Sequence, residues 1–263
     1  SSTSRGLGDV YKRQLEKKIP QIRVTGDSTQ STFRGRHNRL CLKGSYPAAD
    51  VARTTLEVYL NGLWKTCEEA SAAADPELVR HLRVTARRSS VALSIFSPLL
   101  SKKLVISFKQ SLRELRRTAG ATRDYDVLCE RLQLHLPPES SSSGIQRSSI
   151  EQLLQLVAVK QIANRQSISE IRSQLLLWGW HSRVDDLTNS TQRNKKNYHD
   201  FIKSRLKKSC EQFSDTAKAS PKKTKPLHKL RIAGKNLRYT LELIPKKNLS
   251  KPLKRCQLSL IHI

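Results

Sequence analysis

The sequence predicts an all-α fold, and three observations support that prediction. Apolar residues recur at spacings of three and four along most of the 263 residues, which is the period of an amphipathic helix. No long run alternates apolar with polar residues, and aromatic residues make up only 5% of the chain, so the composition does not favour strands. The third observation is an internal repeat of a helical pattern.

Two segments that lie 148 residues apart, measured from Arg80 to His228, are variants of one sequence. The first, VRHLRVTARR, covers 79–88, and the second, LHKLRIAGKN, covers 227–236. A fixed offset that extends further along the chain indicates two copies of one structural unit. The offset continues to pair apolar positions: Leu93 with Leu241, Ile95 with Leu243 and Phe96 with Ile244.

Each copy, written as a helix, is cationic on one side and apolar on the other. At about 100° per residue the basic residues of each copy fall on one arc, which is roughly 80° wide in the second copy. A single helix of this kind is usually a solvated surface helix. Two copies with cations at matching positions favour a binding role instead. The cations are Arg80, Arg83 and Arg87 in the first copy, and His228, Arg231, Lys235 and Arg238 in the second.

Seven helices are predicted in chain order, each from a stripe of apolar residues at helical spacing. Cations are expected on one face of the third of them, including Arg113, Arg116 and Arg117. The seven predicted helices cover 47–72, 76–97, 102–119, 123–134, 150–180, 191–213 and 227–244.

Capping residues set several of the expected helix ends. The segment DPE at 75–77 supplies an N-cap, a proline at the first helical position and an acidic first turn. Gly120 is expected to stop the third helix. Asp124 and Asp126 would then lie in the first turn of the fourth helix, where they suit the helix dipole and an interhelical salt bridge better than contact with a ligand.

The expected organisation is two helical repeats joined by a linker. The first repeat covers 47–136, a serine-rich linker covers 137–149, and the second repeat covers 150–257. No counterparts of the third and fourth helices follow the second cationic helix. We therefore expect the second repeat to be incomplete.

Both ends of the chain are expected to lie outside the folded region. Residues 1–46 mix Ser, Thr, Gly and Arg without a helical period, which predicts disorder. The segments SSTSRGLGDVYKRQ at 1–14 and LSLIHI at 258–263 resemble translated sequencing-adaptor sequence. We expect neither segment to belong to the natural protein.

The chain is strongly basic, with a formal net charge of +27 for a mass of 29.9 kDa. Repulsion among so many like charges destabilises a compact monomer unless an anion neutralises part of it. A polyanionic partner is therefore predicted. Net charge alone does not distinguish nucleic acid, an acidic membrane surface and a phosphate polymer.

Cysteine usage and hydropathy indicate where the protein works. The five cysteines are far apart and form no CxxC pair, which predicts a reducing compartment and no zinc site. No apolar stretch has the length of a signal peptide, or of the roughly 20 residues that cross a bilayer. We therefore expect a cytoplasmic protein without a membrane partner or a cofactor.

Three segments resemble the CHAD domain, a family named for conserved histidines in an α-helical domain. They are VRHLRVTARR at 79–88, RRTAGATRDYDVL at 116–128 and LHKLRIAGKNLRYTLEL at 227–243. The resemblance covers roughly 50–257. It implies two antiparallel helical bundles related by a pseudo-twofold axis, of which the second would be incomplete here.

The resemblance also implies a function. CHAD domains bind inorganic polyphosphate in a basic groove or channel, are often found at polyphosphate granules and are not known as enzymes. It implies no metal or cofactor and leaves the oligomeric state open. The residues expected to contact polyphosphate are Arg80, His81, Arg83, Arg87, Arg88, Arg113, Arg116, Arg117, His228, Arg231, Lys235 and Arg238.

The two copies match the family pattern unequally. His228 falls on the family histidine of the second copy. In the first copy Arg80 takes that position and His81 lies one residue later, so the cation is kept but the proton exchange of an imidazole is lost. Ser90 replaces the cation equivalent to Arg238, which makes the first basic face the weaker one.

Other functions stay open at this point. A basic helical protein holds nucleic acid non-specifically at low salt, although these basic faces lack the interleaved aromatic residues that stack on single strands. A purely structural helical bundle is a third interpretation. An enzyme is not expected, because GxxxxGK, HExxH and GxSxG motifs are absent and the acidic residues are too scattered for a two-metal phosphatase.

Overall fold

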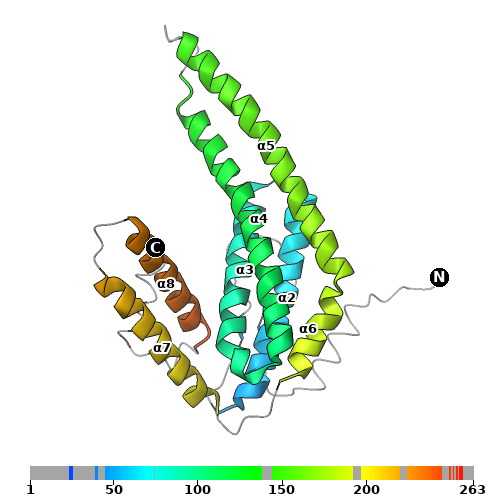
Figure 1. Cartoon of the computed structure of the whole chain (residues 1–263), viewed down its shortest axis with the longest axis vertical. Helices are drawn as coiled ribbons and strands as arrows, with labels where there is room; N and C mark the ends of the chain where they lie inside the picture. Colours follow the sequence, from blue (N-terminus) through cyan, green and yellow to red (C-terminus); the bar gives the residue numbers. More distant parts are fainter. Residues whose placement is uncertain are drawn as a thin grey trace, which may run out of the picture.

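The computed structural model of the chain is helical over nearly all the residues that it describes (Figure 1). Those residues are 45–73, 75–137, 144–191, 197–219 and 224–244, the isolated positions 249, 251, 253, 255 and 256, and the backbone of 24–25 and 39–40.

Seven α-helices, one 3-10 turn and two short strands make up the elements of this described part. The helices are α2 (Ala48–Ala72), α3 (Pro76–Phe96), α4 (Lys102–Leu134), α5 (Gly144–Leu177), α6 (Trp180–Asn189), α7 (Tyr198–Lys218) and α8 (Thr224–Glu242), and the turn η1 (Ser97–Leu99) follows α3. Helices α2, α3, α4 and α5 alternate in direction, α6 continues the direction of α5, and α7 and α8 form a further hairpin (Figure 1).

A four-helix bundle forms the body of the protein. Helix α3 packs between α2 and α4, and α5 closes the ring because it contacts both α4 and α2. The bundle core continues around α6 through an aromatic group in which Phe108 contacts Trp178 and Trp180 edge to face and Trp64 stacks on Trp180. Replacing one fully buried leucine of this core, such as Leu82, by alanine typically costs about 2–5 kcal/mol.

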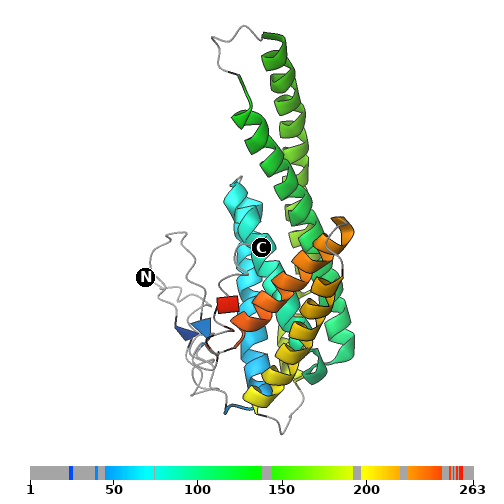
Figure 2. The ribbon, with the colours of Figure 1, turned by 90° about the vertical axis from the view of Figure 1, so that its left-hand side faces the viewer.

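The duplication predicted from the sequence is visible in the arrangement of α2, α3, α7 and α8. Adding the offset of 148 to the bounds of α2 and α3 gives 196–220 and 224–244, which lie within two residues of α7 and α8. Equivalent helices contact one another, α2 with α7 and α3 with α8, as a pseudo-twofold axis between the two hairpins requires. Figure 2 shows α7 and α8 as a hairpin beside the bundle.

Burial confirms that the apolar positions paired by the offset are equivalent. All six side chains are buried in one core, so both copies use the same helix face for packing. In the second copy the described residues that follow α8 include helical positions 251, 253, 255 and 256, close to where the offset puts the start of an α4 counterpart. The paired core positions are Leu93 and Leu241, Ile95 and Leu243, and Phe96 and Ile244.

The N-terminal end of α3 confirms the capping prediction. Asp75 is the N-cap and its Oδ1 accepts a hydrogen bond of 2.8 Å from the backbone N–H of Glu77, while Pro76 takes the first helical position. Caps of this kind contribute about 1 kcal/mol. They fix the point at which the basic helix begins.

The break predicted at Gly120 is wrong, because α4 runs without interruption for 33 residues. Buried positions continue at helical spacing on both sides of the glycine, so the cost of a glycine within a helix is offset by packing. Asp126 is consequently in the middle of a helix rather than in a first turn. The buried positions of α4 that continue the stripe are Leu112, Leu115, Ala119, Thr122 and Asp126.

The interhelical salt bridge expected of these aspartates is confirmed for Asp126. This carboxylate is buried, and its Oδ1 accepts hydrogen bonds from Arg165 at 3.0 Å and from Gln161 at 2.6 Å, both on α5. Asp124 makes a second, longer contact, with its Oδ1 3.8 Å from Nη1 of Arg83. The two aspartates therefore hold α4 to α5 and to α3.

The region between 134 and 198 also differs from the prediction. Helix α5 begins at Gly144, inside the segment expected to be a linker, and it packs in the first bundle, so 137–149 does not separate two packing units. Gly179 adopts φ 81°, a left-handed conformation open chiefly to glycine, and it ends the helix expected to reach 180. A separate helix, α6, then begins at Trp180 and buries Trp180, Val184 and Leu187 at helical spacing.

The predicted disorder over 1–46 needs correction at several positions. Two short strands, β1 (Val24–Thr25) and β2 (Arg39–Leu40), pair antiparallel. Tyr46 is packed on the core, and its carbonyl accepts a hydrogen bond of 2.8 Å from the backbone of Tyr198. The remainder of the expected disordered segment, including the adaptor-like 1–14, and the tail 258–263 lie outside the described residues.

The ends of α4 and α5 extend together beyond the ends of α2 and α3, as Figure 1 shows. We call this projection the arm and define it as residues 127–134 of α4 and 144–163 of α5. Contacts between the two helices continue into it, since Val157 is buried and Arg147 donates a 3.0 Å hydrogen bond to the carbonyl of Pro137.

Gly120→Ala is expected to stabilise the protein by about 0.5–1 kcal/mol, because a methyl group at this helical position would meet no atom within 4 Å. Gly179→Ala is the matched control. It should destabilise by about 1 kcal/mol or more, since φ 81° strains any residue with a Cβ. Urea unfolding measures both, and a loss of stability in Gly120→Ala would favour the interrupted helix predicted from the sequence.

Candidate polyanion-binding site

Helix α3 lies between α4 and α8, and its position brings three sets of cations together. Its apolar stripe of Leu82, Ala86 and Leu93 is buried in the bundle. Because side chains three and four residues apart share a helix face, burying this stripe leaves Arg83 and Arg87 on the side that α4 and α8 approach.

A charged contact joins α3 to α8. Nε of Arg88 lies 2.7 Å from Oε2 of Glu242, and Nη2 donates a longer bond of 3.4 Å to Oε1. Both side chains are largely buried, at 15% and 23% exposed, so removing either partner would leave a poorly solvated charge. The phenol of Tyr59 on α2 is partly buried near this pair, and its burial, followed by the charge of Glu242, raises the pKa of Tyr59 to about 12.

Arg238 and Tyr239 complete the contact between α3 and α8. Both Arg88 and Arg238 lie against the ring of Tyr239, with guanidinium carbons 5.7 Å and 4.6 Å from its centroid. Nη2 of Arg238 donates a 2.7 Å hydrogen bond to the Tyr239 hydroxyl. These two arginines therefore help to pack α8 against α3, and they also add positive charge to the surface there.

The cations that converge beside this contact form the basic cluster, which we define as Arg83, Arg87, Arg116, Arg231 and Lys235. Arg87 lies at its centre, because its charge acts on Arg83 of its own helix, on Arg116 of α4 and on Lys235 of α8. Burial, followed by the charges of Arg87 and Arg113, lowers the pKa of Arg116. Three helices thus contribute positive charge to one surface.

The duplication places the cluster on the pseudo-twofold axis. Under the offset of 148, Arg83 corresponds to Arg231 and Arg87 corresponds to Lys235. The other three members of these pairs act on Lys235, whose lowered pKa reflects burial first and then the charges of Arg87, Arg231, Arg238 and Arg83. Duplication and packing therefore double the positive charge at one place instead of creating two separate sites.

The pKa of Lys235 reflects both its burial and the repulsion from the cations around it. Burial and its four cationic neighbours lower the pKa of its ammonium group from 10.5 to about 8. The Lys235 side chain is half-buried, and no carboxylate of the described residues lies within 4.0 Å of its ammonium group. An anion bound here would relieve this repulsion.

Arg83 has a weak acidic neighbour in Asp124 of α4. Its pKa is lowered by burial and by Arg87 and Arg123, while Asp124, 3.8 Å away, opposes the shift. Arg123 is itself paired with Glu130 at 2.9 Å. The cluster therefore keeps a large net positive charge.

Other residues expected from the sequence to contact the polyanion have different surroundings. Arg80 is exposed and pairs with Glu77 of its own helix at 2.7 Å. His81 is exposed, and its pKa is lowered by partial burial first and by Arg88 and Arg80, while Glu69 of α2 opposes this shift. Arg113, Arg117, His228 and Arg231 are exposed.

Sequence reasoning missed the part played by Glu242. The offset equates Glu242 with Ser94 and Arg88 with Asn236, so the Arg88–Glu242 pair has no counterpart across the pseudo-twofold axis. Its position four residues after Arg238 was a signal in the sequence, since an i,i+4 pair on a helix commonly interacts. The contact with Arg88, 154 residues away, had no local signal.

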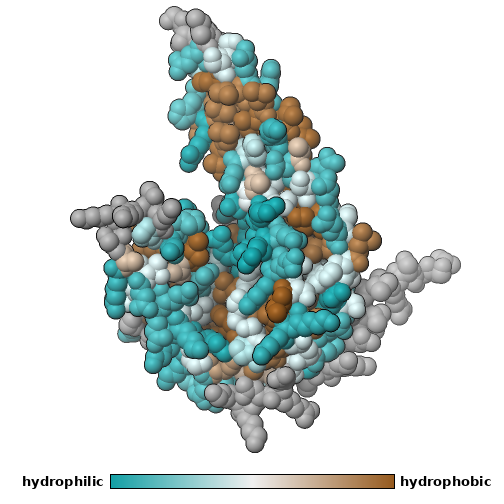
Figure 3. Space-filling model, viewed as in Figure 1, coloured by the Kyte–Doolittle hydropathy of each residue, from teal (hydrophilic) through white to brown (hydrophobic). Residues whose placement is uncertain are grey.

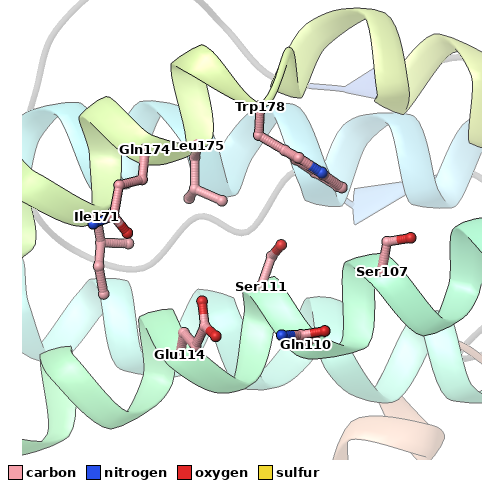
Figure 4. Close-up of a pocket in the computed structure, with 8 residues that line it drawn as sticks. All are labelled: Ser107, Gln110, Ser111, Glu114, Ile171, Gln174, Leu175 and Trp178. Carbon is pink, nitrogen blue, oxygen red and sulfur yellow. The ribbon is translucent and has the colours of Figure 1, made fainter.

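Two clefts lined by described residues lie away from the basic cluster. One of about 290 Å³ lies between α4 and α5, as Figure 4 shows, with Glu114 as its charged side chain; Arg116 lies on the opposite side of α4. A second cleft of about 220 Å³ lies between α7 and α8 and is lined by Lys229 but by no member of the cluster. The cluster is an open surface, which suits a chain-like ligand better than a small enclosed one.

The sequence profile of the CHAD domain family matches residues 55–258, which include most of α2 and all of α3 to α8. The chain belongs to the CHAD domain family. Its basic cluster therefore lies within the family's domain and on the segments around 79–88, 116–128 and 227–243 that resemble that family.

Two solved structures share the fold of this CHAD domain. The CHAD domain from the plant Ricinus communis is 19% identical, with a TM-score of 0.64, and the match covers 89% of this chain and 80% of that one. PptA from Streptomyces chartreusis is 16% identical, with a TM-score of 0.60, and the match covers 82% of this chain and 81% of that one. These likenesses confirm the all-α CHAD fold.

None of the curated proteins matches the sequence of this CHAD domain. In the part of the chain that the structure describes, none of the helices combines the length and the apolar character that crossing a bilayer requires.

Lys235→Gln is expected to stabilise the CHAD domain at about pH 7. Because the pKa of Lys235 is lower in the folded protein than in the unfolded chain, the unfolded chain binds more protons between about pH 8 and 10.5. The charged lysine therefore costs stability below pH 8, and this cost disappears as the pH rises through that window. We expect a gain of about 2–4 °C in Tm at pH 7 once solvent screening is allowed for.

Thermal unfolding of wild type and variant across this pH range measures the difference between them. Lys229→Gln, an exposed lysine on the face of α8 that meets α7, is the matched control and should change Tm little. Equal effects of the two substitutions would show that Lys235 is not under local repulsion.

Proposed function

We propose that this CHAD domain binds inorganic polyphosphate across its basic cluster. The observation that supports the proposal is the convergence of cations from α3, α4 and α8 on Arg87, where burial and then repulsion among the cations lower the pKa values of Arg83, Arg116 and Lys235. A site that is destabilised by its own charge gains the most from a polyanion. Family membership supports the same ligand class.

The geometry suits a linear polymer of phosphates. Cations from two pseudo-symmetric helices and from α4 lie on one open surface, so consecutive phosphates can meet consecutive side chains. The planar forks of Arg83, Arg87 and Arg116 can each engage two phosphate oxygens, whereas Lys235 acts as a point charge. Arg88 and Arg238 position α8, because their guanidinium groups are engaged with Glu242 and Tyr239.

The proposed activity is binding without cleavage, in the cytoplasm and at polyphosphate granules. The carboxylate of Asp124, which lies beside the cluster, is paired with Arg83 at 3.8 Å. Release of inorganic phosphate from polyphosphate in the presence of magnesium would contradict this part of the proposal.

Arg87→Gln should weaken the binding of long-chain polyphosphate about tenfold, because it removes a charge-assisted contact at the centre of the cluster. By analogy with single-stranded nucleic acids, the slope of log affinity against log salt should fall by about 0.7. Fluorescence anisotropy with a labelled polyphosphate measures both quantities.

Lys229→Gln removes the same charge from a face outside the cluster and should change affinity about twofold or less, since exposed charges at a distance are screened. Equal losses from Arg87→Gln and Lys229→Gln would indicate non-specific attraction. Displacement of polyphosphate by duplex DNA at equal phosphate concentration and physiological salt would favour the nucleic-acid alternative.

Affinity should fall as the pH rises from about 7 to about 9.5, because free Lys235 loses its proton with a pKa of about 8 while a bound polyanion favours the charged form. Binding therefore takes up protons in this window. Lys235→Arg, which stays protonated, should flatten the profile at constant ionic strength. An unchanged profile in Lys235→Arg would exclude Lys235 from the site.

A further inference from the structure

The arm carries a surface that the proposed binding function does not use. Six of the eleven large apolar side chains left exposed in the described part of the chain lie on it. Figure 3 shows an apolar surface over the projecting end of α4 and α5, in contrast to the hydrophilic surface around much of the body. The six are Leu128 (42% exposed), Leu134 (83%), Leu153 (48%), Leu156 (65%), Val159 (65%) and Ile162 (69%).

Four of these residues form a regular ridge on α5. Leu153, Leu156, Val159 and Ile162 follow one another at intervals of three, which is one of the two side-chain rows that helices use to pack against each other. The row is also symmetric about its midpoint. In an antiparallel pair of α5 helices centred there, Leu156 would face Val159, which is the self-complementarity of a twofold interface. Leu153 and Ile162 point to opposite sides of α5 at 100° per residue, so they would lie at the two edges of this contact.

Charge distinguishes the arm from the rest of the molecule. The arm has three basic and two acidic residues, a net charge of +1, whereas the whole chain carries +27. Arg147 pairs with Glu151 at 2.9 Å, and Glu130 pairs with Arg123 at 2.9 Å, so the acidic groups of the arm are already matched. Repulsion between like-charged proteins is weakest at this surface, and an acidic partner would find more cations elsewhere.

We propose that two copies of the chain associate through their arms. The two arms pack antiparallel, with α5 against α5 at Leu156 and Val159 and α4 of each copy beside it, in a four-helix interface related by a twofold axis. This direction of packing puts the two basic bodies at opposite ends of the pair. The arrangement buries the apolar ridge and separates the charges that would otherwise oppose association.

The size of the arm is sufficient for this interface. About 20 residues of α5 span about 30 Å, and two helices side by side are about 20 Å wide. The face is therefore about 600 Å² per partner, or about 1,200 Å² in total, at the lower end of specific interfaces. Association in the micromolar range is expected, strengthened rather than weakened by salt because the buried surface is apolar.

Sedimentation of the full chain, free of polyphosphate and in high salt, tests the proposal. A reversible dimer is expected across the micromolar range. Leu156→Lys should weaken it at least about tenfold, whereas Ile106→Glu should leave it unchanged, since Ile106 is equally exposed on α4 but lies outside the arm. Both positions are exposed, and circular dichroism checks that each variant keeps its helical content.

A mixture of two variants tests the register. Leu156→Lys and Val159→Glu should each be largely monomeric alone and should form a mixed dimer when combined, because the introduced lysine and glutamate face each other across the axis. A monomer at all concentrations, a dimer insensitive to Leu156→Lys, or a dimer lost in high salt would overturn the proposal. Failure of the mixed pair to associate would overturn the antiparallel register.

Discussion

The contact between α3 and α8 is the constraint on which the rest of this structure depends. It brings Arg83 and Arg87 close to Arg231 and Lys235, their equivalents in the second copy. The repulsion between these neighbouring positive charges opposes folding. Two features offset the repulsion. The apolar faces of the two helices are buried in one core, where each fully buried aliphatic side chain contributes about 1.5–3 kcal/mol. The Arg88–Glu242 pair then ties the helices together beside the cluster.

The asymmetry of that pair follows from the duplication. The two copies are similar enough to pack about a common axis, yet Glu242 has a serine as its counterpart and Arg88 has an asparagine. One copy therefore supplies an acid that fixes the geometry without placing a carboxylate on both sides of the axis. A second acid at the equivalent place would neutralise part of the surface that attracts the ligand. The stabilising contact and the binding surface are kept separate in this way.

Much of the fold was predictable from periodicity, because α2, α3, α7 and α8 have clear apolar stripes, and α3 and α7 also have side-chain N-caps. The errors occurred where a local signal competed with packing. Gly120 has the sequence signature of a helix end, but the buried stripe from Leu112 to Asp126 continues through it. Gly179 has the same signature and does end a helix, since the chain must turn there to return Trp180 to the aromatic core. The local sequence alone does not predict which of these two glycines ends a helix.

The cationic positions were also predictable, but their environments were not. The helical spacing of the sequence placed Arg83, Arg87 and Lys235 on basic helix faces, and the structure brings those faces together. It also engages Arg88 with an acid 154 residues away, which depends on how helices distant in sequence pack. Sequence periodicity predicts the helix face on which a residue lies, but it does not predict which residue of another helix that residue contacts.

The unbroken course of α4 has a further consequence. One rigid helix carries Arg116 of the basic cluster at one level and the arm at its far end, about 20 Å away at 1.5 Å per residue. In the proposed pair of chains, two such helices would hold the two basic clusters about 40 Å apart along the arm axis. A polymer shorter than this separation can occupy one cluster only, while a longer one can reach both. The length of α4 would then set a threshold of ligand length above which two weak contacts act together.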